Sequence, residues 1–485
     1  MDAFKRYAGN VGLAGGTNVI VTLKGFILIP ILTKGLGAEF YGIYALIVVT
    51  ISLLAPLCTL GLGYAIVRFL GPEKDREKVS KGVSSIFVVT SSIALAVSIL
   101  LFAFSRPLST AFFGGVDATF YIKIAAFLVF LTAFEQIMAN YFRAFQQMKK
   151  YAIFTISSVI GQIALTAYLV LVADWGLSGV FVSILVIMAL VSLLGFFWIK
   201  SDIKISTPSF SIIKDYLPLA LPILPISLCY WFINLGDRYV IGYFMGADAV
   251  GVYSAAYGLG GVVAFFYAPI ATALLPAITG LYEDNRIQEV KTHLKYSLKF
   301  FLMFAIPSVF GLSVLSRSLL ETLTTSEFIG GYTIVPIIAL ATVLFSCGNI
   351  YGNVLFLLKR TRMMSLIYVG LALLNVALNI ILVLFIGIIG AAIATLITFM
   401  TQLVVASRMS SKGLRFDVDF RFIVKSVISS AVMAIVAWQL NPAGLVNILI
   451  SVIIAVVVYF GVLILLRGFT RREYGALRDI VKGVR

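Results

Sequence analysis

The stretch Gly37-Ala38-Glu39-Phe40-Tyr41-Gly42-Ile43-Tyr44 returns 209 residues later, from 37 to 246, as Gly246-Ala247-Asp248-Ala249-Val250-Gly251-Val252-Tyr253. Two more pairs of segments repeat at an offset of 211, from 105 to 316 and from 175 to 386: Ser105-Arg106-Pro107-Leu108 with Ser316-Arg317-Ser318-Leu319, and Trp175-Gly176-Leu177-Ser178-Gly179 with Ile386-Gly387-Ile388-Ile389-Gly390. Three matches in the same order at nearly one offset indicate an internal duplication.

Long apolar runs separate these motifs. The chain of 485 residues is 61% hydrophobic and only 12% charged, with a mean hydropathy of +1.06, whereas a soluble domain is about half apolar and about one quarter charged. A helix needs ~20 apolar residues to cross the hydrocarbon core, and continuous rather than alternating apolar runs exclude a membrane β-barrel. The sequence therefore predicts an all-α integral membrane protein with about 14 transmembrane helices.

The expected spans group into two lobes and two trailing helices. We place the spans at 11–33, 42–67, 82–104, 120–142, 152–173, 176–199, 217–243, 251–279, 296–316, 332–357, 363–385, 387–407, 420–440 and 445–466. Spans 1–6 form an N-lobe over 1–200, spans 7–12 a C-lobe over 201–408, spans 13–14 fall within 409–467, and 468–485 is a basic cytoplasmic tail. Because six is an even number, we expect both lobes to have the same orientation, with a cleft between them.

Positive charge is concentrated in every second connection. Of the 37 Lys and Arg residues, 31 lie in one alternating set of connections, and the other set holds only Lys34, Arg106, Lys123 and Arg317. The positive-inside rule then predicts that both termini are cytoplasmic. The net charge of +16 is thus a topology signal and an attraction to anionic membrane lipid, and we expect no nucleic-acid partner.

The sequence contains no pattern typical of catalysis. It has no phosphate-binding G-x-x-x-x-G-K-[ST] motif and no Ser/His/Asp arrangement on an extended loop, and its only histidine is His293. Its three cysteines, Cys58, Cys229 and Cys347, all fall inside apolar runs, where cysteine usually acts as a small core residue. We therefore expect no catalytic residues, no metal and no cofactor, and a transporter rather than an enzyme.

Several segments resemble one transporter family. They are Leu36-Gly37-Ala38-Glu39-Phe40-Tyr41-Gly42-Ile43-Tyr44, Gly236-Asp237-Arg238-Tyr239-Val240-Ile241-Gly242 and Leu275-Pro276-Ala277-Ile278. The chain resembles the polysaccharide transporter (Wzx-type oligosaccharide flippase) family of the multidrug/oligosaccharidyl-lipid/polysaccharide (MOP) exporter superfamily. The resemblance implies export of a lipid-linked oligosaccharide, such as a polysaccharide or O-antigen-like repeat unit, across a prokaryotic plasma (inner) membrane by alternating access. It implies a polyprenyl-linked substrate and a glycan polymerase or ligase as partners, and we expect a monomer.

Lys24 is an ionisable residue in the middle of the first span. Such a group at the bilayer centre costs roughly 2.5–3.5 kcal/mol, so each one needs a reason. Asn10, Thr17 and Lys24 follow one helix face at a spacing of seven. We interpret Lys24 as a cationic wall of the cleft that binds the anionic substrate. The alternative is a structural pair with an acid such as Glu135.

Asp237 and Arg238 lie in the seventh span, where Ser227, Trp231, Asn234 and Arg238 share a polar-aromatic face. In one interpretation Asn234 and Arg238 bind the substrate while Asp237 orients the guanidinium. In the other, Asp237 and Arg238 form a local pair that neutralises itself and pins the span.

The remaining candidates are one cation, one acid and three prolines. Arg68 ends span 2 and is either the inner cationic mouth of the cleft or a topology anchor. Glu135 is either a coupling or orienting carboxylate or part of a helix-packing polar cluster. Pro218, Pro222 and Pro225 predict a kink in span 7, which is either a gate hinge or only a bend.

Three function classes compete on this sequence. A flippase for a pyrophosphate-linked substrate needs a cationic lumen, which Lys24, Arg68 and Arg238 supply. A multidrug/cation antiporter of the same superfamily needs a titrating buried carboxylate, for which Glu135 and Asp237 are candidates. A membrane enzyme such as a glycan polymerase needs a sizeable loop or a catalytic constellation, and the sequence offers neither.

Overall fold

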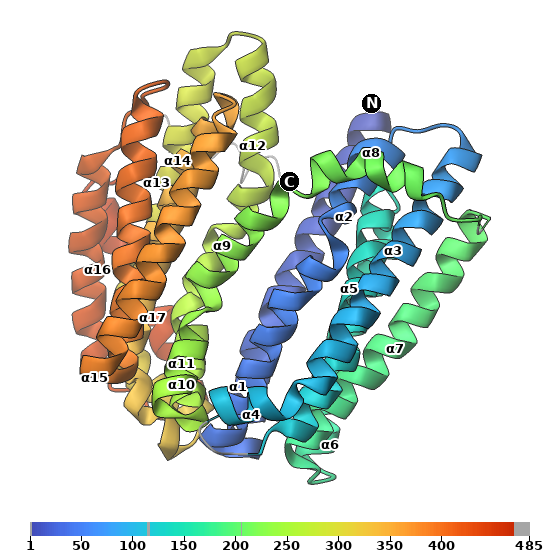
Figure 1. The fold of residues 1–485 in the computed structure, drawn as a ribbon. Helices are drawn as coiled ribbons and strands as arrows, with labels where there is room; N and C mark the ends of the chain where they lie inside the picture. Colours follow the sequence, from blue (N-terminus) through green and yellow to red (C-terminus); the bar gives the residue numbers. More distant parts are fainter. Residues whose placement is uncertain (1, 114–116, 205, 470–485) are drawn as a thin grey trace. The chain divides into compact units, whose positions relative to one another are not determined.

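The computed structural model describes residues 2–113, 117–204 and 206–469, and every regular element in these ranges is helical (Figure 1). The elements are α1 (Asp2–Thr59), α2 (Leu62–Ala65), η1 (Ile66–Leu70), α3 (Arg76–Ala103), α4 (Ser105–Phe112), α5 (Thr119–Ala144), α6 (Met148–Leu171), α7 (Gly176–Asp202), α8 (Phe210–Ala220), α9 (Ile223–Leu235), α10 (Asp237–Met245), α11 (Ala247–Gly260), η2 (Gly261–Phe266), α12 (Ala268–Glu283), α13 (Ile287–Leu323), η3 (Ser326–Thr333), α14 (Ile334–Leu357), α15 (Thr361–Ser411), α16 (Phe420–Leu440) and α17 (Leu445–Leu465). Most of the expected basic tail over 468–485 and the side chain of Asn10 lie outside the described residues.

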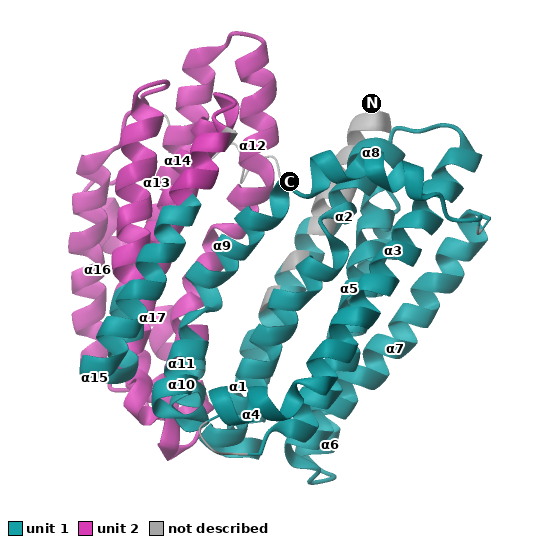
Figure 2. Cartoon of the chain, in the orientation of Figure 1, with its two compact units in different colours: residues 1–255, 368–394 teal, residues 256–367, 395–485 magenta. Residues whose placement is uncertain are grey.

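The chain divides into two compact units, shown in teal and magenta in Figure 2. Unit 1 consists of 1–255 and 368–394, and unit 2 of 256–367 and 395–485. These units are defined by contacts, whereas the predicted lobes at 1–200 and 201–408 are defined by the repeat. The lobe boundaries stay a prediction.

The helices are long and apolar enough to cross a membrane many times. Among the described residues, 11 helices meet this test, or 12 if the bent pair Phe210–Ala220 and Ile223–Leu235 is one span. Two of them, Gly15–Thr59 and Arg362–Ser411, are 45 and 50 residues long, about twice the ~20 residues that one span needs. The all-α membrane fold is therefore confirmed, and the exact count of fourteen spans stays a prediction.

The breaks in the long helices fall at the repeated glycines. Gly37 has φ 76° and ψ 177° inside α1, and its repeat counterpart Gly246 has φ 89° and ψ 177° at the end of α10. Gly176 and its counterpart Gly387 also have positive φ, at 53° and 61°. Glycine reaches such conformations without the steric penalty that a Cβ brings. The duplication in the sequence is therefore also a duplication of backbone conformation.

Span 7 is bent where the prolines predict a kink. The axes of α8 and α9 differ by 52° across a short break, and Pro222, which has no N–H to donate, precedes α9. Pro218 lies inside α8 and Pro225 in the first turn of α9. The span expected at 217–243 is wrong only in its start, because the helix α8 already begins at Phe210; the predicted break is present between α8 and α9.

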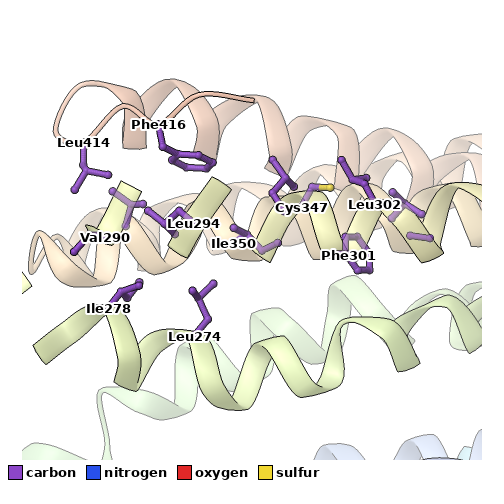
Figure 3. Packing of buried hydrophobic residues seen from close by; sticks show 14 of the residues in the cluster. Leu274, Ile278, Val290, Leu294, Phe301, Leu302, Cys347, Ile350, Leu414 and Phe416 are labelled. Atoms are coloured by element: carbon purple, nitrogen blue, oxygen red, sulfur yellow. The ribbon is translucent and has the colours of Figure 1, made fainter. Parts of the chain in front are cut away.

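Unit 2 is organised around α13. Figure 3 shows its apolar core, in which Leu274 and Ile278 of α12 lie opposite Leu294 of α13, with Ile350 of α14 nearby. The two trailing helices pack on α13 as well. The Tyr459 hydroxyl on α17 donates to the Met303 carbonyl oxygen at 2.8 Å. Spans 13 and 14 are therefore integral parts of unit 2.

At the beginning of α16, Lys299 of α13 pairs with Asp419. The two groups are 3.0 Å apart, and the Lys299 ammonium lies over the Phe422 ring. Asp419 also caps α16, because its carboxylate accepts from the backbone N–H of Phe422. One charged pair thus fixes where α16 starts and holds it to α13.

Candidate functional site

The two copies of the repeated motif pack directly against each other in unit 1. A Cβ added at Gly42 would collide with the carbonyl oxygen of Ala247, and a Cβ added at Gly251 would collide with the carbonyl oxygen of Ala38. Small residues allow helix backbones to approach this closely inside a membrane. We call the four residues Ala38, Gly42, Ala247 and Gly251 the glycine seam.

The glycine seam is reciprocal. Ala38 corresponds to Ala247 and Gly42 to Gly251 at the repeat offset of 209 residues, from 38 to 247 and from 42 to 251. The contact of Gly42 with Ala247 is therefore the counterpart of the contact of Gly251 with Ala38. Two equivalent motifs meet here as the two halves of a twofold contact do.

A buried ion pair lies next to the seam. The Arg238 Nη1 donates to Asp237 Oδ1 at 2.5 Å and to the Asn234 carbonyl oxygen at 2.8 Å. The Tyr253 hydroxyl donates to Asp237 Oδ2 at 2.5 Å, and the guanidinium lies over the Tyr253 ring at 5.2 Å. Asp237 and Arg238 are only 1% and 5% exposed. Tyr253 is the last residue of the second motif copy, so the pair holds α10 to α11.

Both interpretations offered for Asp237 and Arg238 include a bond between the two side chains, and this bond is present. The Asn234 amide donates to the Tyr230 carbonyl oxygen of its own helix at 2.8 Å. A guanidinium engaged in this way holds the backbone at the α9–α10 junction and leaves little surface for a phosphate. A role of Asn234 and Arg238 in substrate binding stays a prediction.

Aromatic and hydroxyl groups tie α9 and α10 to the second half of α1. The Trp231 Nε1 donates to the Ser52 hydroxyl at 3.0 Å and to the Val49 carbonyl oxygen at 3.2 Å. The hydroxyls of Thr50 and Tyr239 are 2.5 Å apart. These contacts link α1 to α9 and α10. The sequence predicted the polar-aromatic face that contains Trp231 but none of its partners on α1.

Lys24 lies in a second polar cluster, built by α1, α5 and α6. Its ammonium donates to the Gln162 Oε1 at 2.5 Å, and the Gln162 amide donates to the Ser158 hydroxyl at 3.0 Å. Lys24 also interacts electrostatically with Glu135. The Glu135 Oε1 is shielded from solvent and has no hydrogen-bond partner among the described residues. The cluster therefore holds one cation, one amide and one under-satisfied carboxyl group.

The expected proximity of Lys24 to Glu135 is thus present, and Gln162 is the member that the sequence did not reveal. The only signal for it was an isolated polar side chain in an apolar run. The structure brings Lys24 together with Glu135 and Arg238 together with Asp237, in separate clusters. Whether Lys24 lines a cleft stays a prediction.

Arg68 lies on η1, a π-helical turn over Ile66–Leu70, and its side chain is exposed. Single π-helical turns interrupt helices and are frequent at functional positions. The turn ends span 2 and leads into the basic connection before α3. Both interpretations of Arg68, cationic mouth and topology anchor, remain predictions.

Comparison with known proteins gives the family. The family model described as polysaccharide biosynthesis protein matches residues 8–281, more than half of the chain, and a second model, MatE, matches residues 222–381. The chain belongs to the polysaccharide biosynthesis protein family. The family expectation from the sequence is therefore confirmed.

Two proteins of Haloferax volcanii are similar to this chain. One, named probable low-salt glycan biosynthesis flippase Agl15, is 26% identical over 265 residues, which cover 55% of this chain and 56% of that protein. The other, named probable flippase AglR, is 25% identical over 216 residues, which cover 43% of this chain and 45% of that protein. The matched part of the chain thus spans about half the length of these relatives.

Solved structures share the fold over most of the chain. The lipid II flippase MurJ in an inward closed conformation matches with a TM-score of 0.74 at 19% identity, over 94% of this chain and 98% of that one. An inward-facing multidrug resistance MATE family transporter of the MOP superfamily matches with a TM-score of 0.67 at 17% identity, over 81% and 94%. The fold is therefore that of MurJ and the MATE transporters.

Proposed function

We propose that this protein is a flippase that moves a lipid-linked oligosaccharide across the plasma membrane by alternating access. The match of the polysaccharide biosynthesis family model to residues 8–281 carries this proposal. The relative named probable low-salt glycan biosynthesis flippase Agl15 supports the substrate class, and the relative named probable flippase AglR supports the mode of action. The family match and the relatives named as flippases support a transporter rather than an enzyme.

Within this proposal, Lys24 is the cation that meets the substrate. An ammonium is a compact, mobile point charge, and Lys24 is partly exposed, with a hydrogen bond to one amide oxygen and an electrostatic interaction with Glu135. A pyrophosphate can replace these contacts one by one. Arg238 serves the cycle differently, because its buried pair with Asp237 holds the helices that carry the glycine seam.

The alternative is a multidrug/cation antiporter of the same superfamily. The MatE match over 222–381 and the unpartnered Glu135 Oε1 favour it. A coupling carboxylate needs to exchange ions, and Asp237 is locked by Arg238 and Tyr253, so Glu135 is the better candidate for that role. The two functions make opposite demands on the Lys24 cluster, which must attract anions in the flippase and cations in the antiporter.

The setting of the flippase follows from its chemistry. We propose the plasma (inner) membrane of a prokaryote, with both termini cytoplasmic because the basic connections lie on one side. The substrate is a polyprenyl-linked oligosaccharide, a glycan polymerase or ligase uses it after export, and the transporter works as a monomer.

Accumulation of the substrate in cells tests the function. Deleting the gene should cause a lipid-linked oligosaccharide to accumulate on the inner leaflet, and a plasmid copy should clear it. A deletion strain that accumulates no lipid-linked sugar but loses resistance to cationic drugs would replace the flippase with the antiporter. Complementation with Lys24→Met combined with Glu135→Gln, checked for normal protein level, then asks whether the charge of Lys24 is needed for export.

A further inference from the structure

An apolar groove with a volume of about 660 Å³ opens between α3, α5 and α7 of unit 1. Leu95, Ile99 and Phe102 of α3 line one wall, and Phe127 and Phe130 of α5 line the other. The one hydroxyl in the lining, on Ser98, donates to the Ala126 carbonyl oxygen at 2.7 Å. The volume lies within the ~300–1,000 Å³ typical of pockets that hold small ligands. The groove therefore suits a hydrocarbon chain.

One end of this groove carries a cation. The Lys123 ammonium lies over the Phe102 ring, 5.2 Å from its centroid, an arrangement in which the ring face attracts the positive charge. Lys123 is in the first turns of α5, close to the connection from α4. Asp117 in this connection interacts electrostatically with Lys123 and with Arg106 of α4. Two cations and one anion leave a net positive charge at this end.

The position of these cations is unusual for the chain. Lys123 and Arg106 are two of only four Lys and Arg residues on the side of the membrane that the charge alternation predicts to be nearly free of positive charge. Topology therefore gives no reason for them. Asp117 balances only one of the two positive charges. Next to an apolar groove in the membrane, the partner of matching chemistry for the remaining charge is an anionic lipid.

We propose that the groove between α3, α5 and α7 binds an anionic lipid, with one acyl chain along Leu95, Ile99 and Phe127 and the phosphate at Lys123. Phe102 contributes to both the chain site and the phosphate site, because its ring lines the groove and lies under the Lys123 ammonium. This site is separate from the Lys24 cluster and does not depend on the transported substrate. It belongs to the leaflet opposite the basic connections.

Native mass spectrometry of the purified full chain tests the proposal. The probes are phosphatidylglycerol and phosphatidylcholine with identical chains. The variant Lys123→Gln should retain severalfold less phosphatidylglycerol than the unchanged protein, with no change for phosphatidylcholine. The matched control Arg317→Gln removes a cation of the same charge-poor set, on α13 outside the groove, and should retain both lipids as the unchanged protein does. Equal retention by Lys123→Gln and Arg317→Gln overturns the proposal.

A second variant tests the groove itself. Ala103 is exposed and lines the groove, so Ala103→Trp should fill it without removing a contact. A phosphatidylglycerol with a photoreactive chain should label peptides of α3, α5 and α7, and Ala103→Trp should reduce that labelling severalfold. Labelling elsewhere, or labelling that Ala103→Trp leaves unchanged, contradicts the proposal, as does a crosslink to a second protein copy. Only variants that elute as a single species are compared.

Discussion

Gly42 and Gly251 occupy equivalent positions in the two motif copies, and each faces a carbonyl oxygen of the other copy. Neither position leaves room for a Cβ. The seam between α1 and α11 therefore depends on backbone-to-backbone contact, and a single methyl group on either side is enough to open it.

The first prediction concerns this seam. Gly42→Ala and Gly251→Ala should each lower the free energy of unfolding by about 1–3 kcal/mol, the usual range for overpacking. The double variant should lose less than the sum of the two, because one methyl group already separates the backbones that the other would push apart. Thermal unfolding in detergent measures both effects.

Gly352→Ala is the matched control, because no atom lies within 4 Å of a Cβ at this position in α14. It should be neutral or stabilise the protein by up to about 1 kcal/mol through helix propensity. The shared seam would be contradicted if Gly42→Ala and Gly251→Ala lost no more unfolding free energy than Gly352→Ala. It would also be contradicted if the losses of the two seam variants were strictly additive.

The second prediction separates pairing from transport at Lys24. Lys24→Met removes the charge that interacts with Glu135 and the ammonium that donates to Gln162. An acceptor left unsatisfied in a shielded place costs about 1–3 kcal/mol. Protein level in the membrane should fall. Lys24→Met combined with Glu135→Gln should restore the level but not export, measured as lipid-linked oligosaccharide left on the inner leaflet. Restored export would show that Lys24 serves only to pair with Glu135.

The third prediction concerns the shape of the Arg238 side chain. A lysine ammonium cannot donate to Asp237 and to the Asn234 carbonyl oxygen with the planar geometry of a guanidinium. Arg238→Lys should therefore lose about 1.5–3 kcal/mol of stability, the usual contribution of a hydrogen bond to a charged group, and transport should fall. Arg317→Lys, in an exposed pair with Glu321, is the control and should change neither. Full stability in Arg238→Lys would mean that charge alone suffices.

The fourth prediction is a pH dependence at Asp419. Burial raises the pKa of this carboxyl, but hydrogen bonds from Lys299 and from the Phe422 N–H, with the charges of Lys299 and Lys295, outweigh burial and lower the pKa below its ordinary value. The stabilisation is therefore complete above the ordinary pKa and is lost as the pH falls through the lowered one.

Comparing melting temperatures of the unchanged protein and Asp419→Asn across an acid pH series checks this dependence. The difference in melting temperature between the two proteins should be constant near neutral pH and should shrink toward zero at acid pH. Asp417 is exposed and lies two residues before Asp419. Asp417→Asn is therefore the control. A difference that persists at the acid end would assign the effect to helix packing instead of charge.

The fifth prediction concerns the driving force. Moving one negative charge outward from an electrically negative cytoplasm gains ~2.3 kcal/mol per 100 mV, so a pyrophosphate substrate should flip outward under potential alone. Vesicles clamped with potassium and valinomycin, without proton or sodium gradients, provide the measurement. No net outward movement at interior-negative potential would favour antiport through Glu135.

The sequence predicted features that leave a mark in residue type. The duplication, the breaks at Gly37 and Gly387 and the kink near Pro222 all depend on residues with special backbone properties. The apolar runs and the alternation of charge likewise predicted a helical membrane protein. Each of these signals is local, so one sequence suffices to detect it.

Beyond Lys24 near Glu135 and Asp237 beside Arg238, the sequence did not predict which side chains meet. Gln162 accepts from Lys24, and Tyr253 donates to Asp237, but each partner comes from another helix whose rotation no local pattern fixes. The π-helical turn at Ile66–Leu70 and the start of α8 at Phe210 were missed for the same reason. Packing against neighbouring helices decides them.

The repeated left-handed glycines also show how the two copies of an ancestral half have diverged. Where only glycine fits, at Gly37 and Gly246, both copies still carry it. Elsewhere they have drifted apart: at the same offset, Lys24 corresponds to Ile233, and Arg238 corresponds to Ile29. Each copy thus has a cation where the other has an apolar residue. The glycines that set the backbone conformation are thus kept in both copies, whereas the cations are not. Whatever Lys24 and Arg238 do in the transport cycle, each does it in one copy only.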